Sequence, residues 1–315
     1  MTRPILLQLV PLADHPALQR VDEHYERVQV SDPGQLPSGL AQRVQIILAT
    51  AMTPVTAALM DQLPALKAIC SIGVGYDAID RRHAHQRGIA VSNTPDVLND
   101  CVADMAWALM LDTARRVSEA DRYVRAGQWR QANSFPLATR VSGKKLGIVG
   151  LGRIGQVIAR RAGGFDMELR YHNRRPRKDV DWHYEPSLIE LAHWADILVI
   201  AAVGGDETRG LINRAVMDAL GPQGILINIS RGSVVDERAL VKALQEGRLG
   251  GAGLDVFESE PGVPEELARL DQAVLTPHVA SATRETRDAM LRLTLDNILH
   301  FQRTGSLLTP VAFHE

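Results

Sequence analysis

Residues 144–175 read KKLGIVGLGRIGQVIARRAGGFDMELRYHNRR. The apolar residues 146–149 are typical of a buried strand, and a helical segment over 154–162 and a second strand over 169–172 follow. Three glycines between the first strand and the helix have the spacing G-x-G-x-x-G: Gly150, Gly152 and Gly155. In a strand–helix–strand unit of about 30 residues, this spacing is typical of a turn that binds the pyrophosphate of a dinucleotide. The stretch therefore predicts a Rossmann-like domain and a dinucleotide cofactor.

Each of the three glycines has a physical reason in such a turn. The first permits the sharp change of direction, the second lets the backbone approach the pyrophosphate, and the third lets the helix pack closely on the strand. The free N–H groups and the dipole at the helix N-terminus then hold the phosphates. The alternative is an ordinary glycine-rich turn that serves only packing, and the strand and helix on either side argue against it.

The residues after the second strand indicate which dinucleotide binds. Proteins that bind NAD carry an acidic residue about 20 positions beyond the glycines, whereas an arginine suits the 2′-phosphate of NADP. Here the window reads Asn173-Arg174-Arg175-Pro-Arg-Lys and contains no carboxylate. Guanidinium groups bind phosphate through paired hydrogen bonds. We therefore expect Asn173, Arg174 and Arg175 to contact the cofactor, with NADPH preferred and NADH possible; a solvated basic turn is the alternative interpretation.

The composition is that of a globular protein with two domains. The chain has 315 residues, of which 45% are hydrophobic and 23% charged, and this length exceeds the usual size of a single core. A net charge of −2 gives no field that would attract nucleic acid or an anionic membrane, and no apolar run reaches the roughly 18 residues of a membrane span. Cys70 and Cys101 have the spacing of neither a disulfide framework nor a zinc site. We expect a cytoplasmic protein without a metal.

Short apolar runs alternate with helical segments outside the glycine-rich stretch. In the first hundred residues the expected strands are 5–10, 45–48, 66–72 and 89–91, and the expected helices are 54–62 and 78–86. The alternation resumes after residue 175 and continues to residue 275. This pattern predicts parallel sheets, so the expected fold class is α/β, with two Rossmann-like domains built on doubly wound parallel sheets.

Two long helical patterns mark the domain organisation. One runs from residue 97 to about 129 and is followed by a loop over 128–141, and the other begins after Thr283 as N-cap and runs to about residue 302. The dinucleotide-binding unit is complete before the last helix, which is therefore expected to return to the first domain. The predicted domains are residues 1–97, completed by 287–315, for the substrate, and residues 98–286 for the dinucleotide.

A second glycine-rich turn lies in the predicted substrate-binding domain. Residues 71–80 read SIGVGYDAID, with two glycines directly after a strand. Backbone amides in such a turn can face a small anion. A turn that serves only packing is an equally open interpretation from the spacing alone.

Charged side chains follow three successive strands of the predicted dinucleotide-binding domain. Arg231, Glu260 and His278 each lie a few residues beyond the end of one strand. Because ligands bind beyond the carboxyl ends of parallel strands, these side chains can converge in one cleft. Together they could reduce a 2-keto acid: the arginine fixes the substrate carboxylate and polarises the carbonyl, the histidine supplies a proton, and the carboxylate holds the imidazole and favours its protonated form. Taken singly, each has a plainer interpretation: a turn cap, a surface carboxylate, or one of 10 histidines with a structural role.

Six segments together resemble the D-isomer-specific 2-hydroxyacid dehydrogenase family: GVGYDAID (73–80), VADMA (102–106), GKKLGIVGLGRIGQ (143–156), NISRGSVVDERAL (228–240), GLDVFESEP (253–261) and LTPHVASAT (275–283). The resemblance implies that Arg231 binds the substrate carboxylate and carbonyl, that Glu260 orients the imidazole, and that His278 is the general acid/base. It also implies that the backbone of Val74 and Gly75 holds the substrate carboxylate, and that cofactor and substrate bind in the interdomain cleft. Further cofactor contacts implied in this way are Val102, Leu151, Arg153, Ile154, Val203, Thr208, Ile229, Arg231, Asp255 and Ser281.

Two local features are similar to the NADPH-preferring glyoxylate/hydroxypyruvate reductases of that family. They are the basic turn at 173–177 and the segment Val203-Gly204-Gly205 before Thr208, in which Val203 stands where proline is usual. The resemblance implies reduction of glyoxylate and hydroxypyruvate with NADPH, to D-2-hydroxy acids. It also implies a homodimer that uses the helix over 97–129.

Other functions remain open from the sequence. Larger keto acids of the 2-ketogluconate or phenylpyruvate type are possible substrates, because the sequence does not fix the volume of the pocket. A formate- or phosphite-type dehydrogenase is a rival enzyme, but the formate type would carry a glutamine where this chain has Glu260. A corepressor-like protein, which uses the cofactor to control assembly, would require an exposed peptide groove and disordered tails.

Overall fold

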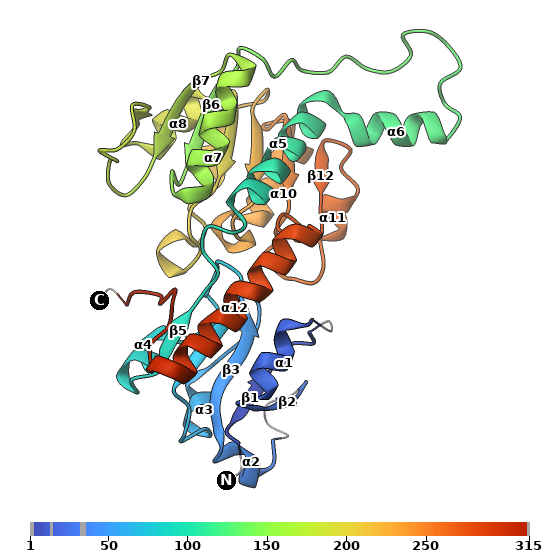
Figure 1. The fold of residues 1–315 in the computed structure, drawn as a ribbon. Helices are drawn as coiled ribbons and strands as arrows, with labels where there is room; N and C mark the ends of the chain where they lie inside the picture. The colour runs from blue at the N-terminus through green and yellow to red at the C-terminus, as the bar shows by residue number, and fades with distance from the viewer. Residues whose placement is uncertain (1–2, 13–14, 32–35, 314–315) are drawn as a thin grey trace. The chain divides into compact units, whose positions relative to one another are not determined.

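The computed structural model describes residues 3–12, 15–31 and 36–313, and the chain divides into two compact units. Unit 1 comprises Met1–Leu98 with Thr283–Glu315, and unit 2 comprises Asn99–Ala282. Each unit is built on a parallel sheet with helices between the strands (Figure 1). The predicted α/β class with parallel sheets is confirmed. The roles assigned to the two predicted domains stay a prediction.

Unit 1 has, within its described residues, a five-stranded sheet in the order β2-β1-β3-β4-β5. Its strands are β1 (Ile5–Gln8), β2 (Glu26–Gln29), β3 (Val44–Thr50), β4 (Ala68–Ile72) and β5 (Ala90–Ser92). Its helices are α1 (Ala17–Asp22), α2 (Ser38–Ala41), α3 (Ala57–Asp61), α4 (Arg81–Gln86) and α12 (Arg284–Thr304). Apolar side chains of α3 and α4 cover one face of this sheet, and those of α1 and α12 cover the other.

The sequence did not predict strand β2. Its residues, ERVQ, are only partly buried because β2 lies at the edge of the sheet and pairs with β1 alone. The long helix α12 has the predicted N-cap: the Thr283 hydroxyl accepts a hydrogen bond from the Thr286 N–H. The helix ends at Gly305, which has a left-handed φ of 74°.

Unit 2 contains a seven-stranded parallel sheet in the order β12-β11-β10-β9-β6-β7-β8. Its strands are β6 (Lys145–Val149), β7 (Glu168–His172), β8 (His183–Tyr184), β9 (Ile197–Ile200), β10 (Ile225–Asn228), β11 (Gly251–Leu254) and β12 (Ala273–Leu275). Its helices are α5 (Asn99–Arg115), α6 (Val117–Arg125), α7 (Arg153–Ala162), α8 (Leu188–Trp194), α9 (Arg214–Leu220), α10 (Glu237–Gln245) and α11 (Glu265–Ala268). The chain proceeds from β6 to β7 and β8 on one side and from β9 to β12 on the other, so the strand order reverses between β6 and β9, the usual place for a ligand in such sheets.

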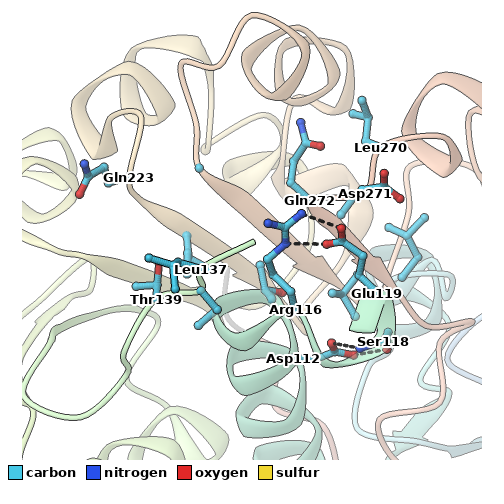
Figure 2. A pocket seen from close by; sticks show the side chains of 18 of the residues that line it. Asp112, Arg116, Ser118, Glu119, Leu137, Thr139, Gln223, Leu270, Asp271 and Gln272 are labelled. Atoms are coloured by element: carbon cyan, nitrogen blue, oxygen red, sulfur yellow. Dashed lines mark hydrogen bonds and ion pairs between the residues drawn. The ribbon is translucent and has the colours of Figure 1, made fainter. Parts of the chain in front are cut away.

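The prediction of one continuous helix over residues 97–129 is wrong. The structure breaks it at Arg116, whose φ of 55° is left-handed, into the buried α5 and the exposed α6. The Asp112 carboxylate accepts a hydrogen bond from the Ser118 N–H at 2.7 Å, so it caps the start of α6, and Arg116 pairs with Glu119 through two hydrogen bonds of 2.6 Å (Figure 2). These local polar contacts turn the chain although the helical pattern continues.

Within the described residues, no helix is both long and apolar enough to span a membrane.

Candidate active site

The predicted site residues of unit 2 follow the carboxyl ends of its strands, with one exception. Because all strands are parallel, these ends lie along one edge of the sheet, and β10, β11 and β12 are immediate neighbours there. Going along the sheet, the residues are His278 and Ser281 after β12, Asp255 and Glu260 after β11, Ile229 and Arg231 after β10, Val203 and Thr208 after β9, Gly150 to Gly155 after β6, and Asn173 to Arg175 after β7. The exception is Val102, which is buried in α5.

His278 and Glu260 form a hydrogen-bonded pair. The Nδ1 atom of His278 lies 2.6 Å from Oε2 of Glu260, whose other oxygen accepts a hydrogen bond from the Phe257 N–H at 2.9 Å. Burial by itself raises the pKa of the Glu260 carboxyl, but the hydrogen bonds from His278 and Phe257 outweigh burial, and the nearby charge of Arg231 acts with them. The net pKa lies below its ordinary value, so the carboxylate stays ionised at neutral pH and acts as an acceptor for Nδ1–H. The Nε2 atom of His278 takes no part in this pair.

Asp255 fixes the backbone around His278. This aspartate is fully buried, and its carboxylate accepts hydrogen bonds from the Thr276 hydroxyl at 2.6 Å and from the N–H groups of Val279 and Ala280 at 2.9 Å each. Its own carbonyl accepts the His278 N–H at 2.9 Å. His278 has a left-handed φ of 51°, which is uncommon for a residue with a side chain. The contacts of Asp255 over-determine this conformation, as expected for a residue whose direction matters.

Arg231 is held by a tight turn after β10. The buried Asn228 accepts the Ser230 N–H at 3.1 Å and donates its side-chain amide to the Arg231 carbonyl at 2.9 Å. Two glycines, which we did not predict as site residues, make room around this turn. A Cβ atom at Gly204 would lie 2.5 Å from Cγ of Arg231, and one at Gly232 would lie 1.8 Å from the backbone carbon of Phe257. Only the tertiary structure shows these close approaches, so spacing could not identify them.

The glycine-rich turn fits a bound pyrophosphate. Gly150 has a left-handed φ of 95°, and a Cβ atom there would lie 2.4 Å from the Ala202 nitrogen. A Cβ atom at Gly155 would lie 2.3 Å from the Gly150 carbonyl oxygen, which shows how closely α7 packs on the turn. Gly152 faces open space, and no side chain caps the N-terminus of α7. A ten-residue helix that begins beside a glycine in open space directs its N-terminal N–H groups and its dipole to where a phosphate can bind.

The basic turn after β7 is tied to the glycine-rich turn. The Asn173 side chain accepts the Leu151 N–H at 2.7 Å, and Arg177, which we did not predict as a contact, donates to the Leu151 carbonyl at 3.3 Å. The Arg174 guanidinium is exposed and lies 2.6 Å from a carboxylate oxygen of Glu207 in the loop after β9. Two loops beside the glycine turn are therefore joined by an ion pair. In that second loop, the Thr208 hydroxyl donates to the Val203 carbonyl at 2.8 Å.

The remaining predicted residues, Val74 and Gly75, belong to unit 1. They follow Gly73, which comes directly after β4 and has a φ of 142°. The Val74 carbonyl accepts a hydrogen bond from the Asn93 side chain at 2.8 Å. No cluster of acidic, histidine or cysteine side chains suited to a metal occurs in the described parts of the chain.

A cavity of about 840 Å³ in unit 2 lies apart from these residues. It is lined by residues of the α5–α6 corner, of the loop before β6, and of β12 and the turn before it, including Arg116, Leu137 and Gln272 (Figure 2). Neither the His278–Glu260 pair nor Arg231 lines it. Its polar and exposed walls show no catalytic arrangement.

The chain is similar to known proteins over most of its length. Residues 107–280 match the family described as D-isomer specific 2-hydroxyacid dehydrogenase, NAD binding domain. The chain is 50% identical over 268 residues to glyoxylate/hydroxypyruvate reductase A HPR2 of Arabidopsis thaliana, covering 85% of each protein. It is 48% identical over 271 residues to hydroxyphenylpyruvate reductase of Plectranthus scutellarioides, covering 86% of each.

Among solved structures, a similar one is the NADPH-dependent glyoxylate/hydroxypyruvate reductase SmGhrB of Sinorhizobium meliloti in complex with NADP and malonate. The TM-score is 0.92 at 42% identity, and the match covers 99% of this chain and 97% of that one. The family match includes the glycine-rich turn and the ends of β10, β11 and β12.

Proposed function

The chain belongs to the D-isomer-specific 2-hydroxyacid dehydrogenase family, and from this premise we propose that it reduces the small 2-keto acids glyoxylate and hydroxypyruvate with NADPH. Family membership makes the protein an oxidoreductase with a dinucleotide-binding domain. The single observation that supports the reaction best is the 2.6 Å contact between His278 and Glu260, at the same sheet edge as the glycine-rich turn. An oriented imidazole beside a nicotinamide site is what carbonyl reduction requires.

We assign three roles to the side chains of this site. The reduced nicotinamide, when bound, supplies a hydride to the carbonyl carbon of the substrate. Arg231 binds the carboxylate and polarises the carbonyl, and His278 gives a proton from Nε2 to the carbonyl oxygen while Glu260 holds Nδ1. Hydride and proton together convert the C=O group to CH–OH, so hydroxypyruvate yields a D-2-hydroxy acid and glyoxylate an achiral one. The backbone of Val74 and Gly75 is assigned to the substrate carboxylate.

The preference for NADPH is assigned to Arg174 and Arg175. The similar structure from Sinorhizobium meliloti is described as NADPH-dependent and contains NADP, and the turn after β7 of this chain is basic and carries no carboxylate. We expect the double change of Arg174 and Arg175 to Gln to raise the KM for NADPH about 10–100-fold, because a hydrogen bond to a charged group is worth about 1.5–3 kcal/mol. The KM for NADH should change by less than about twofold.

Steady-state kinetics with both nicotinamides would check this cofactor assignment. Arg214→Gln, on the exposed surface of α9, is a matched control that removes a guanidinium away from the turn. An unchanged ratio of NADPH to NADH efficiency in the double variant would contradict the assignment.

A panel of keto acids tests the substrate class. Glyoxylate, hydroxypyruvate, a phenylpyruvate-type acid and 2-ketogluconate would each be assayed with NADPH and NADH. Higher kcat/KM for the two small acids supports the proposal, and higher values for a large acid would move the assignment to that class. Preference for a large keto acid is a specific alternative, because one relative is a hydroxyphenylpyruvate reductase. Binding of the cofactor without turnover of any acid would favour a corepressor-like protein.

We also propose that the protein is a homodimer formed through α6 and the loop that follows it. No residue of helix α6 is fully buried within the chain, and the segment exposes the apolar Val117, Val124, Trp129 and Leu137. In Figure 1 this segment extends away from the sheet of its own unit. Exposed apolar side chains gathered on one segment are typical of an interaction surface.

Val124→Asp should convert the dimer to a monomer, because an unpaired charge in a buried interface costs several kcal/mol. Light scattering would measure the mass of each form in solution. Ile189→Asp, which replaces a partly exposed apolar residue on α8, is the control and should leave the mass unchanged. A wild-type protein with the mass of a single chain would rule out this part of the proposal.

A further inference from the structure

Asn93 and Thr94 hold the glycine-rich turn that follows β4. The fully buried Thr94 accepts the Gly73 N–H on its hydroxyl at 3.1 Å and donates its own N–H to the Gly73 carbonyl at 2.8 Å. Asn93 donates its side-chain amide to the next carbonyl, that of Val74, at 2.8 Å. Two consecutive carbonyls of the turn are therefore held by adjacent residues that lie about 20 positions further along the chain.

The contact from Asn93 determines the direction of the next N–H. The peptide between Val74 and Gly75 is trans, and in a trans peptide the C=O and N–H bonds point in opposite directions. Holding the Val74 carbonyl towards Asn93 therefore turns the Gly75 N–H away from Asn93. A reversed peptide would present a carbonyl oxygen where an N–H group stood, and so would repel an anion that the native turn attracts.

Asn93 is itself supported by the C-terminal part of unit 1. The Thr309 hydroxyl donates to the Asn93 carbonyl at 2.6 Å and accepts from the side-chain amide of Asn297 at 3.0 Å. Asn297 lies fully buried on α12, and its side-chain oxygen, Oδ1, accepts hydrogen bonds from the N–H groups of Leu308 and Thr309 at 2.9 and 3.0 Å. This side chain makes hydrogen bonds through both its amide nitrogen and its oxygen, so the support is rigid.

We propose that Asn93 is a positioning residue for the substrate: it orients the Gly75 N–H to bind the carboxylate of a 2-keto acid. The inference rests on the proposed function, which assigns the Val74 and Gly75 backbone to that carboxylate. Asn93 acts through the peptide and does not touch the substrate. Its removal therefore weakens carboxylate binding and leaves proton transfer from His278 unchanged.

Two variants of Asn93 test the inference. Asn93→Ala removes the side-chain amide that donates to the Val74 carbonyl. Asn93→Asp keeps the shape of the side chain but places a carboxylate oxygen, which can only accept a hydrogen bond, opposite the carbonyl oxygen of Val74. Loss of one such hydrogen bond should raise the KM for glyoxylate about tenfold in the alanine variant and further in the aspartate variant. The inhibition constant of malonate, a carboxylate that is not reduced, should rise by the same factor. The kcat, the KM for NADPH and the Tm should stay close to wild type.

The control is Gln86→Ala, which removes an exposed side-chain amide from α4 in the same unit and should change none of these values. The inference would be overturned if Asn93→Ala had the same KM for glyoxylate and the same inhibition constant for malonate as the wild type. It would also be overturned by a loss in which kcat, NADPH binding and Tm fall together, because that pattern describes a purely structural residue.

Failure of the proposed function can be told apart from failure of this inference. If the wild type reduces no keto acid, calorimetry of malonate binding to the NADP⁺-saturated protein still reports the carboxylate site. Binding by the wild type that is about tenfold weaker in Asn93→Ala supports the role of Asn93 without any turnover. Absence of malonate binding to the wild type, or equal binding by both proteins, overturns it.

Discussion

His278→Ala is expected to lower kcat for glyoxylate about 10²–10⁴-fold and to leave the KM for NADPH within about twofold. General acid–base catalysis typically supplies a factor of this size. The His278 imidazole is fixed through Nδ1 by Glu260 at 2.6 Å, so Nε2 is the atom that can give a proton to the substrate oxygen. Alanine has no group that could take over this transfer. Stopped-flow and steady-state oxidation of NADPH would measure the loss.

The backbone at His278 requires a second variant as a control. Its φ of 51° is unfavourable for alanine, so His278→Ala could also disturb the loop. Asparagine adopts this conformation more readily and likewise transfers no proton. We expect His278→Asn to lose as much kcat as His278→Ala while keeping the wild-type Tm. Near-normal turnover in either variant would refute the assignment of His278 as general acid.

Gly232→Ala is expected to lower kcat/KM at least about 100-fold and to lower the Tm. The added Cβ atom would lie 1.8 and 1.9 Å from the carbonyl carbon and oxygen of Phe257 and 2.3 Å from the nitrogen of Glu258. These are backbone atoms and cannot move aside as the end of a side chain can. The turn that carries Arg231 must shift away from the segment that carries Glu260. A displacement of about 1 Å at a catalytic group can cost about 10²-fold in rate.

Gly163→Ala is the matched control for this second change. Gly163 has an ordinary φ of −59°, and a Cβ atom there would meet nothing within 4 Å. The control should keep wild-type kinetics and Tm, which separates the effect of crowding from the general effect of replacing a glycine. Activity and Tm close to wild type in Gly232→Ala would mean that the two segments are not held in register by this contact.

Local patterns predicted those parts of the fold and site that depend on neighbouring residues. Apolar runs separated by helical segments indicated the parallel sheets, because buried strands need apolar residues on both faces. Arg231, Glu260 and His278 could be proposed as a group because strand ends in a parallel sheet share one edge. The structure brings the last two into contact, and the catalytic roles of all three stay predictions.

Individual side-chain contacts were not predictable, whether the residues lie near each other in the sequence or far apart. The break at Arg116 depends on the Asp112–Ser118 hydrogen bonds, which interrupt a helical pattern that continues through them. The room for Arg231 depends on Gly204, from a different loop, and no spacing rule relates the two. The link between Asn93 and Val74 likewise exists only in the folded unit.

Unit 1 is assembled from two segments of the chain, Met1–Leu98 and Thr283–Glu315. Side chains of α12, among them Leu295, Ile298 and Leu299, complete the apolar layer on one face of its sheet. A nascent chain that has emerged from the ribosome only as far as β5 therefore leaves the part of that face that α12 covers open to water. Unit 2 is continuous in sequence, so its own fold does not depend on α12, whereas the apolar layer of unit 1 is completed only after the last helix has been synthesised. Apolar surface that is exposed during such an interval favours aggregation.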